Sequence, residues 1–169
     1  MATVAVSYSS KTDMTITLAS LATDASLFTG REASQKDNTS DLYDDFLISG
    51  FITVGTTPTI NKLILVYAIG SPVSLATTAV DVFDGTDSAE TVTSAGVGSG
   101  YLRPVAQLVV DATTSNRVYP FGPVSLASLS GGVVPPFWTI FVTHNTGVNL
   151  NSTAENHAIS WVGVKYTVA

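Results

Sequence analysis

Two histidines are the residues of this sequence best suited to binding a metal ion. His144 falls near the end of one apolar segment and His157 near the start of the next, so a hairpin would bring both imidazoles to one turn. Glu155 offers a third ligand, but a closed zinc site needs four ligands, and a catalytic site needs three and a water. Histidines at strand ends need no such role, and we predict no metal site.

An acidic segment, Asp81–Glu90, places four carboxylates in ten residues. Calcium prefers oxygen ligands that are gathered in a loop with a glycine turn, and Gly85 lies within this segment. The spacing misses the EF-hand pattern, however, in which ligands occupy alternate positions before the glycine. We therefore interpret the segment as a solvated acidic loop with a turn at Asp84-Gly85.

The residues needed for catalysis are missing or wrongly spaced. The chain has no cysteine and no Gly-x-Ser-x-Gly elbow to hold a serine nucleophile. The only glutamates, Glu32, Glu90 and Glu155, have no aromatic, apolar sequence neighbours that would raise a pKa for acid catalysis. The glycine-rich run 96–100 lacks the Lys-Ser/Thr pair of a phosphate-binding loop. We predict that the protein is not an enzyme and has no catalytic or cofactor-binding residues.

Four aromatic residues offer a rival function, a stacking platform for sugars: Tyr119, Phe137, Trp138 and Trp161. Indole rings in β-sandwiches more often belong to the core, because they bury a large apolar area. Alternation puts Trp138 on one face with Ile140, and Trp161 on one face with Ile159. We therefore predict that both tryptophans are core residues.

The charge of the chain excludes several partners. The net charge is −6, the pI is about 4.5, and the seven basic residues are scattered singly, so no basic stripe is available to neutralise nucleic-acid phosphates. The sequence shows no signal peptide and no apolar run of roughly 20 residues, so no membrane association is expected. Charged residues make up only 12% of the chain. A charge-poor surface suits packing against copies of the chain or another protein.

The elements that position these residues are predicted to be short strands. Alternating or wholly apolar segments bounded by turn residues indicate strands at 3–8, 14–18, 46–54 with a bulge at Gly50, 63–69, 80–83, 102–110, 118–121, 137–144 and 158–168. The segment 63–69 is apolar on both faces and predicts a strand buried on both sides. Pro104 indicates an edge or a strand start. The segment 124–129 is a short strand or one helical turn.

Two longer stretches lack strand periodicity. The polar segment 26–45 is predicted to be a charged loop, with a helical turn at 40–45 capped by Ser40. The segment 70–100 is rich in small residues. We predict an all-β fold, a jelly-roll-like antiparallel β-sandwich, in a single domain over residues 1–169. Residues 1–20 are expected to form an N-terminal strand or arm.

Several segments resemble small virion structural proteins of tailed bacteriophages. They occur in the following order along the chain: Leu27–Ser34, Asp37-Asn38, Leu42-Tyr43, Val82–Glu90, Pro136–Trp138, Val142–Gly147 and Asn156–Ser160. The resemblance is to a loosely defined group without diagnostic catalytic motifs, and it brings no individual binding residues.

The resemblance implies a jelly-roll-like decoration or cement protein on the outer surface of an icosahedral capsid. Its partner would be the major capsid protein, and the chain would form a homo-oligomer, with a trimer favoured, after synthesis in the host cytoplasm. The charged loop Arg31–Asp45 or the N-terminal strand is the expected capsid contact, because loops and termini carry such contacts more often than cores do. The alternative is a carbohydrate-binding β-sandwich module or a head-fibre or adhesin element.

Overall fold

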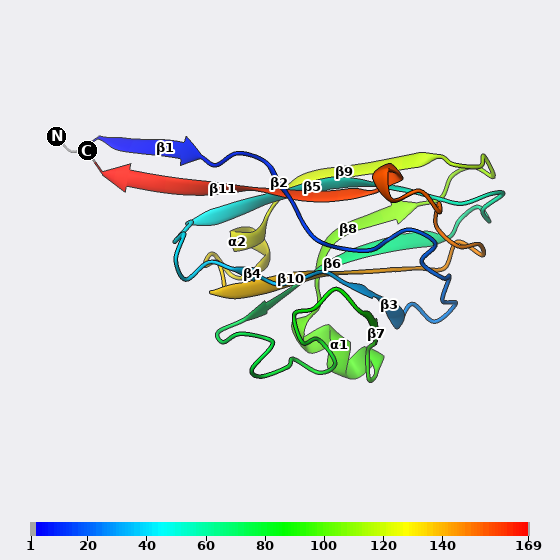
Figure 1. Ribbon diagram of the computed structural model, residues 1–169, viewed down its shortest axis with the longest axis horizontal. Coiled ribbons are helices and arrows are strands. Elements are labelled where there is room, and N and C mark those ends of the chain that lie inside the picture. Colours follow the sequence, from blue (N-terminus) through cyan, green and yellow to red (C-terminus); the bar gives the residue numbers. More distant parts are fainter. Residues whose placement is uncertain (1–2, 169) are drawn as a thin grey trace.

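The computed structural model describes residues 3–168 and consists of two antiparallel β-sheets packed face to face (Figure 1). The first sheet has the order β1-β11-β5-β9, with β2 also paired to β11. The second has the order β7-β3-β10-β6-β8, with β4 also paired to β10. The predicted all-β antiparallel sandwich is confirmed, while the jelly-roll connectivity stays a prediction.

The strands range in length from two residues in β2 and β4 to eleven in β11. The first sheet comprises β1 (Val4–Tyr8), β2 (Thr12–Asp13), β5 (Asp45–Thr53), β9 (Val118–Ser125) and β11 (Ala158–Val168). The second comprises β3 (Thr29–Glu32), β4 (Lys36–Asp37), β6 (Leu63–Ser71), β7 (Ala89–Thr91), β8 (Arg103–Val109) and β10 (Phe137–His144). Three short helices, α1 (Ala95–Tyr101), α2 (Leu126–Leu129) and the 3-10 turn η1 (Ala154–Asn156), complete the described elements.

The main core lies between the two sheets and is built around aromatic rings. The centroid of the Phe46 ring lies 5.0 Å from that of Trp138 and 5.2 Å from that of Trp161, so one ring from β5 joins the two sheets. Trp138 is fully buried and Trp161 is 8% exposed. Both tryptophans are therefore core residues, as predicted. Truncation of such a ring to alanine typically costs about 3–5 kcal/mol.

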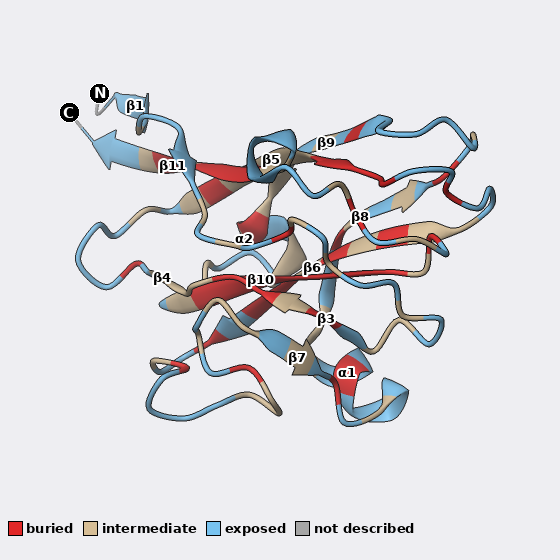
Figure 2. Ribbon diagram, turned by 45° about the vertical axis from the view of Figure 1, so that its right-hand side comes forward, coloured by how far each residue is buried: buried red, intermediate tan, exposed pale blue. Residues whose placement is uncertain are grey.

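A second, smaller core lies on the outer face of the second sheet. Phe141 and Ile69 project away from the main core and pack with Phe83 and Val92, which come from the segment between β6 and β8. Strand β6 is thus lined by apolar residues on both faces, as its sequence predicted (Figure 2). The small-residue stretch 70–100 lies over this outer face of the second sheet, and we call it the cover.

The cover contains a helix that the sequence did not indicate. Helix α1 spans the glycine-rich run, and the Ser94 hydroxyl caps it by accepting a hydrogen bond from Val97 N at 3.2 Å. A Cβ at Gly98 would lie 3.1 Å from the side chains of Val92 and Leu102. Close packing and a serine cap therefore outweigh the low helix propensity of glycine here.

Four other local predictions are wrong. The segment 80–83 is not a strand, since Val80 and Phe83 form only an isolated bridge. Residues 14–18 form no strand, although Met14, Ile16 and Leu18 do point into the main core as their alternation required. The segment 26–45 is not one loop, because it contains β3 and β4. In place of a helical turn at 40–45, the Asn38 side chain closes a loop by bonding to Tyr43 N and Tyr43 O. Such local bonds compete with helix formation.

The two termini form a paired ribbon that extends beyond the sandwich. Strand β1 pairs with the last residues of β11, from Val4 opposite Val168 to Tyr8 opposite Val164. The described part of the chain thus begins and ends at the tip of this ribbon (Figure 1). All five residues of β1 are exposed. The expected N-terminal strand is therefore an extension of the first sheet.

Candidate functional site

The acidic segment is joined by a carboxylate from another strand. Glu32, on β3, has a fully buried side chain. The antiparallel register places Gly30 opposite Glu90 and Glu32 opposite Phe141, so Glu32 and Glu90 project from the same outer face of the second sheet. The cover brings Asp84 to the same place. One carboxylate oxygen from each of Glu32, Asp84 and Glu90 lies within 4.8 Å of the others.

Each carboxylate of this acidic cluster already accepts hydrogen bonds. Glu32 Oε1 accepts from Gly85 N at 2.8 Å and Oε2 from Asp84 N at 3.1 Å. Asp84 Oδ1 accepts from Thr86 N at 2.9 Å, and Glu90 Oε1 accepts from Ser88 Oγ at 2.6 Å. The predicted turn at Asp84-Gly85 is present, with Gly85 at φ +81°. Glu32 therefore anchors this turn to the sheet.

Burial changes the acidity of Glu32. Removal of the carboxylate from water raises the pKa of Glu32 to about 7, while the N–H groups of Gly85 and Asp84 act to lower it and the charges of Asp84 and Glu90 raise it further. The prediction that no glutamate has an apolar, aromatic environment is wrong for this residue. The neighbours that bury it, Phe141 among them, are distant in sequence, so inspection of flanking residues could not find them.

The acidic cluster could contribute three oxygen ligands to a divalent cation. Calcium takes six to eight oxygens, so main-chain carbonyls and water would have to supply at least as many again. Main-chain N–H groups bond to Glu32 and Asp84, and the Ser88 hydroxyl bonds to Glu90, so all three carboxylates have a structural role without an ion. A cluster of this kind does not by itself define a metal site.

Asp87, in the same segment, bonds the cover to strand β3 and to Thr17. Its Oδ1 lies 2.5 Å from Arg31 Nε on β3, and the same side chain accepts hydrogen bonds from the main chain and the hydroxyl of Thr17. Arg31 also donates to Asp87 O at 2.7 Å. The acidic segment is therefore bonded into the fold at several points and is not simply a solvated loop.

The histidines do not share a turn in the way a hairpin would require. His144 ends β10 in the second sheet, whereas His157 precedes β11 in the first, and these strands do not pair with each other. His144 Nε2 lies 3.0 Å from Leu21 O and its Nδ1 lies 3.1 Å from Thr146 Oγ1. His157 Nδ1 accepts from Thr53 N at 3.3 Å, and Nε2 lies 2.9 Å from Asn151 O.

Both imidazoles are thus used to hold loops against the sandwich. Burial lowers the pKa of His144 to about 4 and also lowers the pKa of His157. Glu155 lies exposed in η1. Over residues 3–168, the acidic cluster is the only group of three or more such side chains with ligand atoms close enough to share an ion, and it includes neither histidine.

The four aromatic residues do not form an exposed platform. Trp138 and Trp161 are in the main core, and Tyr119 is only 8% exposed, with its hydroxyl 3.1 Å from an Asp111 carboxylate oxygen. The Trp161 ring is also covered by Lys36, whose Nζ lies 5.0 Å from the ring centroid. Phe137 is half-buried at the start of β10. A flat sugar-stacking surface would need rings with an open face, which Trp138 in particular does not have.

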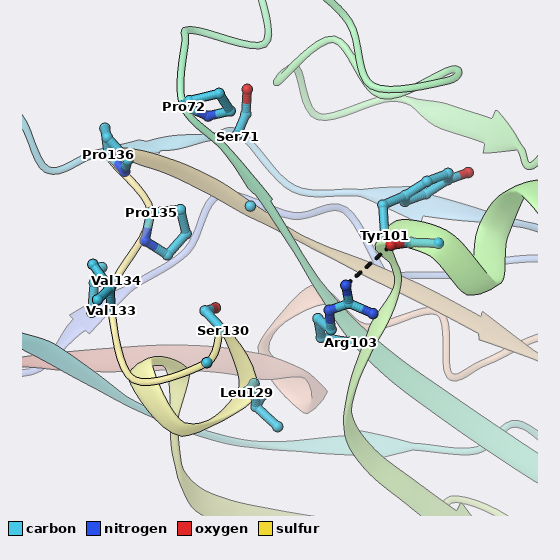
Figure 3. A pocket seen from close by; sticks show the side chains of 13 residues that line it. Ser71, Pro72, Tyr101, Arg103, Leu129, Ser130, Val133, Val134, Pro135 and Pro136 are labelled. Carbon is cyan, nitrogen blue, oxygen red and sulfur yellow. Dashed lines mark hydrogen bonds between the residues drawn. The ribbon is translucent and has the colours of Figure 1, made fainter.

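A groove of about 800 Å³ lies between the end of α1 and the loop that joins α2 to β10 (Figure 3). Pro135 and Pro136 form one wall, and Tyr101 and Arg103 stand on the other side. Arg103 donates from Nη2 to Gly100 O at 3.1 Å and is the only charged residue in the lining. The lining contains no carboxylate, histidine or cysteine.

No protein family, curated protein or solved structure matches the chain. The resemblance to virion structural proteins therefore remains an expectation from the sequence. In the part of the chain that the structure describes, no helix is both long enough and apolar enough to cross a lipid bilayer.

Proposed function

We propose that this protein is a structural virion protein that decorates the outside of an icosahedral phage capsid and stabilises it by binding neighbouring major capsid subunits. The observation that carries the proposal is that the side chains best suited to catalysis or ligand binding all hold parts of the fold together. Both histidines bond to loops, the tryptophans fill the core, and the acidic cluster holds a turn. Each of these groups has a structural task, which favours a function carried by the surface.

The sequence resemblance supplies the class of partner. A β-sandwich with few charges can bind a protein lattice through shape and hydrogen bonds, and any protein that binds only the assembled shell stabilises the shell by mass action. The buried aromatic rings remove the observation that motivated a carbohydrate-binding module.

The capsid contact that we propose is the loop 39–44 between β4 and β5, within the predicted segment Arg31–Asp45. Lys36 and Asp41 are paired with each other at 2.6 Å, so these two charges are partly neutralised within the protein. Leu42, at the tip, is 63% exposed and has φ +53°. An apolar side chain presented on a loop in this way is suited to a pocket between capsid subunits.

The proposal is tested by adding the purified protein to heads of the phage that encodes it, assembled without this chain. Saturating protein should raise the temperature at which the heads release their DNA, and the bound protein should sediment with them. Leu42→Asp should abolish the shift, and aspartate tolerates the left-handed backbone at this position better than leucine does. Thr114→Asp, at an exposed position on the loop between β8 and β9, is the charge-matched control outside the proposed contact. If the wild-type protein neither binds nor shifts the disruption temperature, the proposal is wrong.

A further inference from the structure

The ribbon formed by β1 and β11 has one face made only of valine and tyrosine. Residues directly opposite each other in an antiparallel pair project to the same side. The register pairs Val4 with Val168, Val6 with Tyr166 and Tyr8 with Val164, so all six side chains share one face. We call these six residues the ribbon face. The opposite side of the ribbon carries Ala5, Ser7, Lys165 and Thr167.

Five residues of the ribbon face are exposed in a single chain. The exposed fractions are 62% for Val4, 47% for Val6, 65% for Tyr8, 53% for Tyr166 and 74% for Val168. Scattered exposed apolar residues are normal, but a contiguous apolar patch on a soluble protein usually marks an interaction surface. The ribbon extends beyond the sandwich (Figure 1), and among the six residues of the ribbon face only Val164, at 5% exposed, is buried.

Strand β1 also lacks the features that normally prevent edge strands from associating. It is an edge of the first sheet and contains no charged residue and no proline. Natural edge strands are usually protected by lysine, proline, bulges or a covering segment. The only charge in the paired part of the ribbon, Lys165, is on the opposite side and donates to Asp41 O at 3.1 Å.

From this face we infer that the ribbon is a self-association element, which packs its ribbon face against that of a second copy of this chain. Each chain carries a net charge of −6, so two copies repel each other over most of their surface and approach most easily through an uncharged patch. The ribbon face is such a patch. A partner selected by its charge would have no complementary group to contact here.

The size and shape of the ribbon face also fit a second copy. The five exposed side chains present roughly 500 Å² on each copy, so two facing ribbons would bury of the order of 1,000 Å², the lower limit for a specific interface. If β1 of one copy lies over β11 of the other, Tyr166 faces Val6. A large side chain would then meet a small one, which favours close packing.

Self-association is tested on the purified full chain without capsids, so its outcome does not depend on the proposed capsid binding. Sedimentation equilibrium should give a discrete oligomer at protein concentrations of about 10–100 μM. Val6→Asp should weaken the association by about 30-fold or more, because it buries an unpaired charge in the contact. Ser7→Asp is the matched control on the opposite side, next to Lys165, and should leave the mass unchanged.

A second measurement covers the case in which Val6→Asp fails to fold. The chain has no cysteine, so single thiols can be placed without background. Val6→Cys should react with a maleimide more slowly in the oligomer than Ser7→Cys does, and the two rates should become similar on dilution to monomer.

Three outcomes would overturn the inference. They are a wild-type monomer throughout the concentration range, an oligomer that persists in folded Val6→Asp, and equal protection of both thiols. A monomer whose Val6→Asp variant loses only capsid binding would assign the ribbon face to the capsid.

Discussion

Replacement of Glu32 by glutamine should change how stability depends on pH. Glu32 has a pKa of about 7 in the folded protein against an ordinary value of 4.5, so the folded state holds its proton more tightly. Between these two values the unfolded state binds fewer protons, and the free energy of unfolding therefore falls as pH rises. The shift corresponds to a loss of about 2–3 kcal/mol between pH 5 and pH 8.

Glu32→Gln removes this titration and keeps the shape of the side chain. At pH 5, where Glu32 is protonated, the variant should be slightly less stable, because the amide NH₂ faces an N–H of the turn at Asp84 or Gly85. At pH 8 the variant avoids the buried negative charge. The difference in unfolding free energy, variant minus wild type, should therefore increase by about 2–3 kcal/mol from pH 5 to pH 8.

Urea unfolding at several pH values measures this difference. Glu155→Gln, at an exposed position, is the control for the chemical change from carboxylate to amide. Carbon-13 NMR of the Glu32 carboxyl group should give a midpoint near 7 directly. A difference between Glu32→Gln and wild type that does not change with pH would refute the burial of this carboxylate.

Three further predictions concern other parts of the sandwich. His144, with a pKa of about 4, should remain neutral by imidazole NMR down to about pH 5, and a midpoint near 6.5 would contradict its buried position. Its titration should lower the free energy of unfolding by about 2–3 kcal/mol as pH falls from 6.5 toward 4, the opposite sign to Glu32. Gly30→Ala should lower the free energy of unfolding in urea by more than about 2 kcal/mol, because its Cβ would collide with Val142 O and the Phe141 ring. Gly100→Ala in α1, where the Cβ meets nothing, should raise that free energy by about 0.5–1 kcal/mol, and equal effects would show that the β3–β10 contact is looser than described. Asp87→Asn should lower the free energy of unfolding in urea by about 1–3 kcal/mol, because Arg31 and Thr17 lose their charged partner. An unchanged free energy of unfolding would show that other contacts hold the cover.

The sequence by itself determined the fold class and several residues of the main core. Strand periodicity depends only on the alternation of side chains along a chain, so Trp138, Trp161 and Ile140 could be assigned to the core from local pattern alone. Even where residues 14–18 form no strand, the alternating side chains still reach the core. Pro104 likewise lies in the edge strand β8, because a residue without an N–H cannot serve a central position.

Only the tertiary structure decided which distant residues meet. The pairing of β3 with β7 and β10 buries Glu32 opposite Phe141, and the placement of β10 and β11 in different sheets separates the histidines from the hairpin that their spacing suggested. The ribbon face likewise depends on the register between the first and last strands of the chain. Local sequence sets the period of a strand but not its partner, and both the acidity of Glu32 and the exposure of the ribbon face follow from the partner.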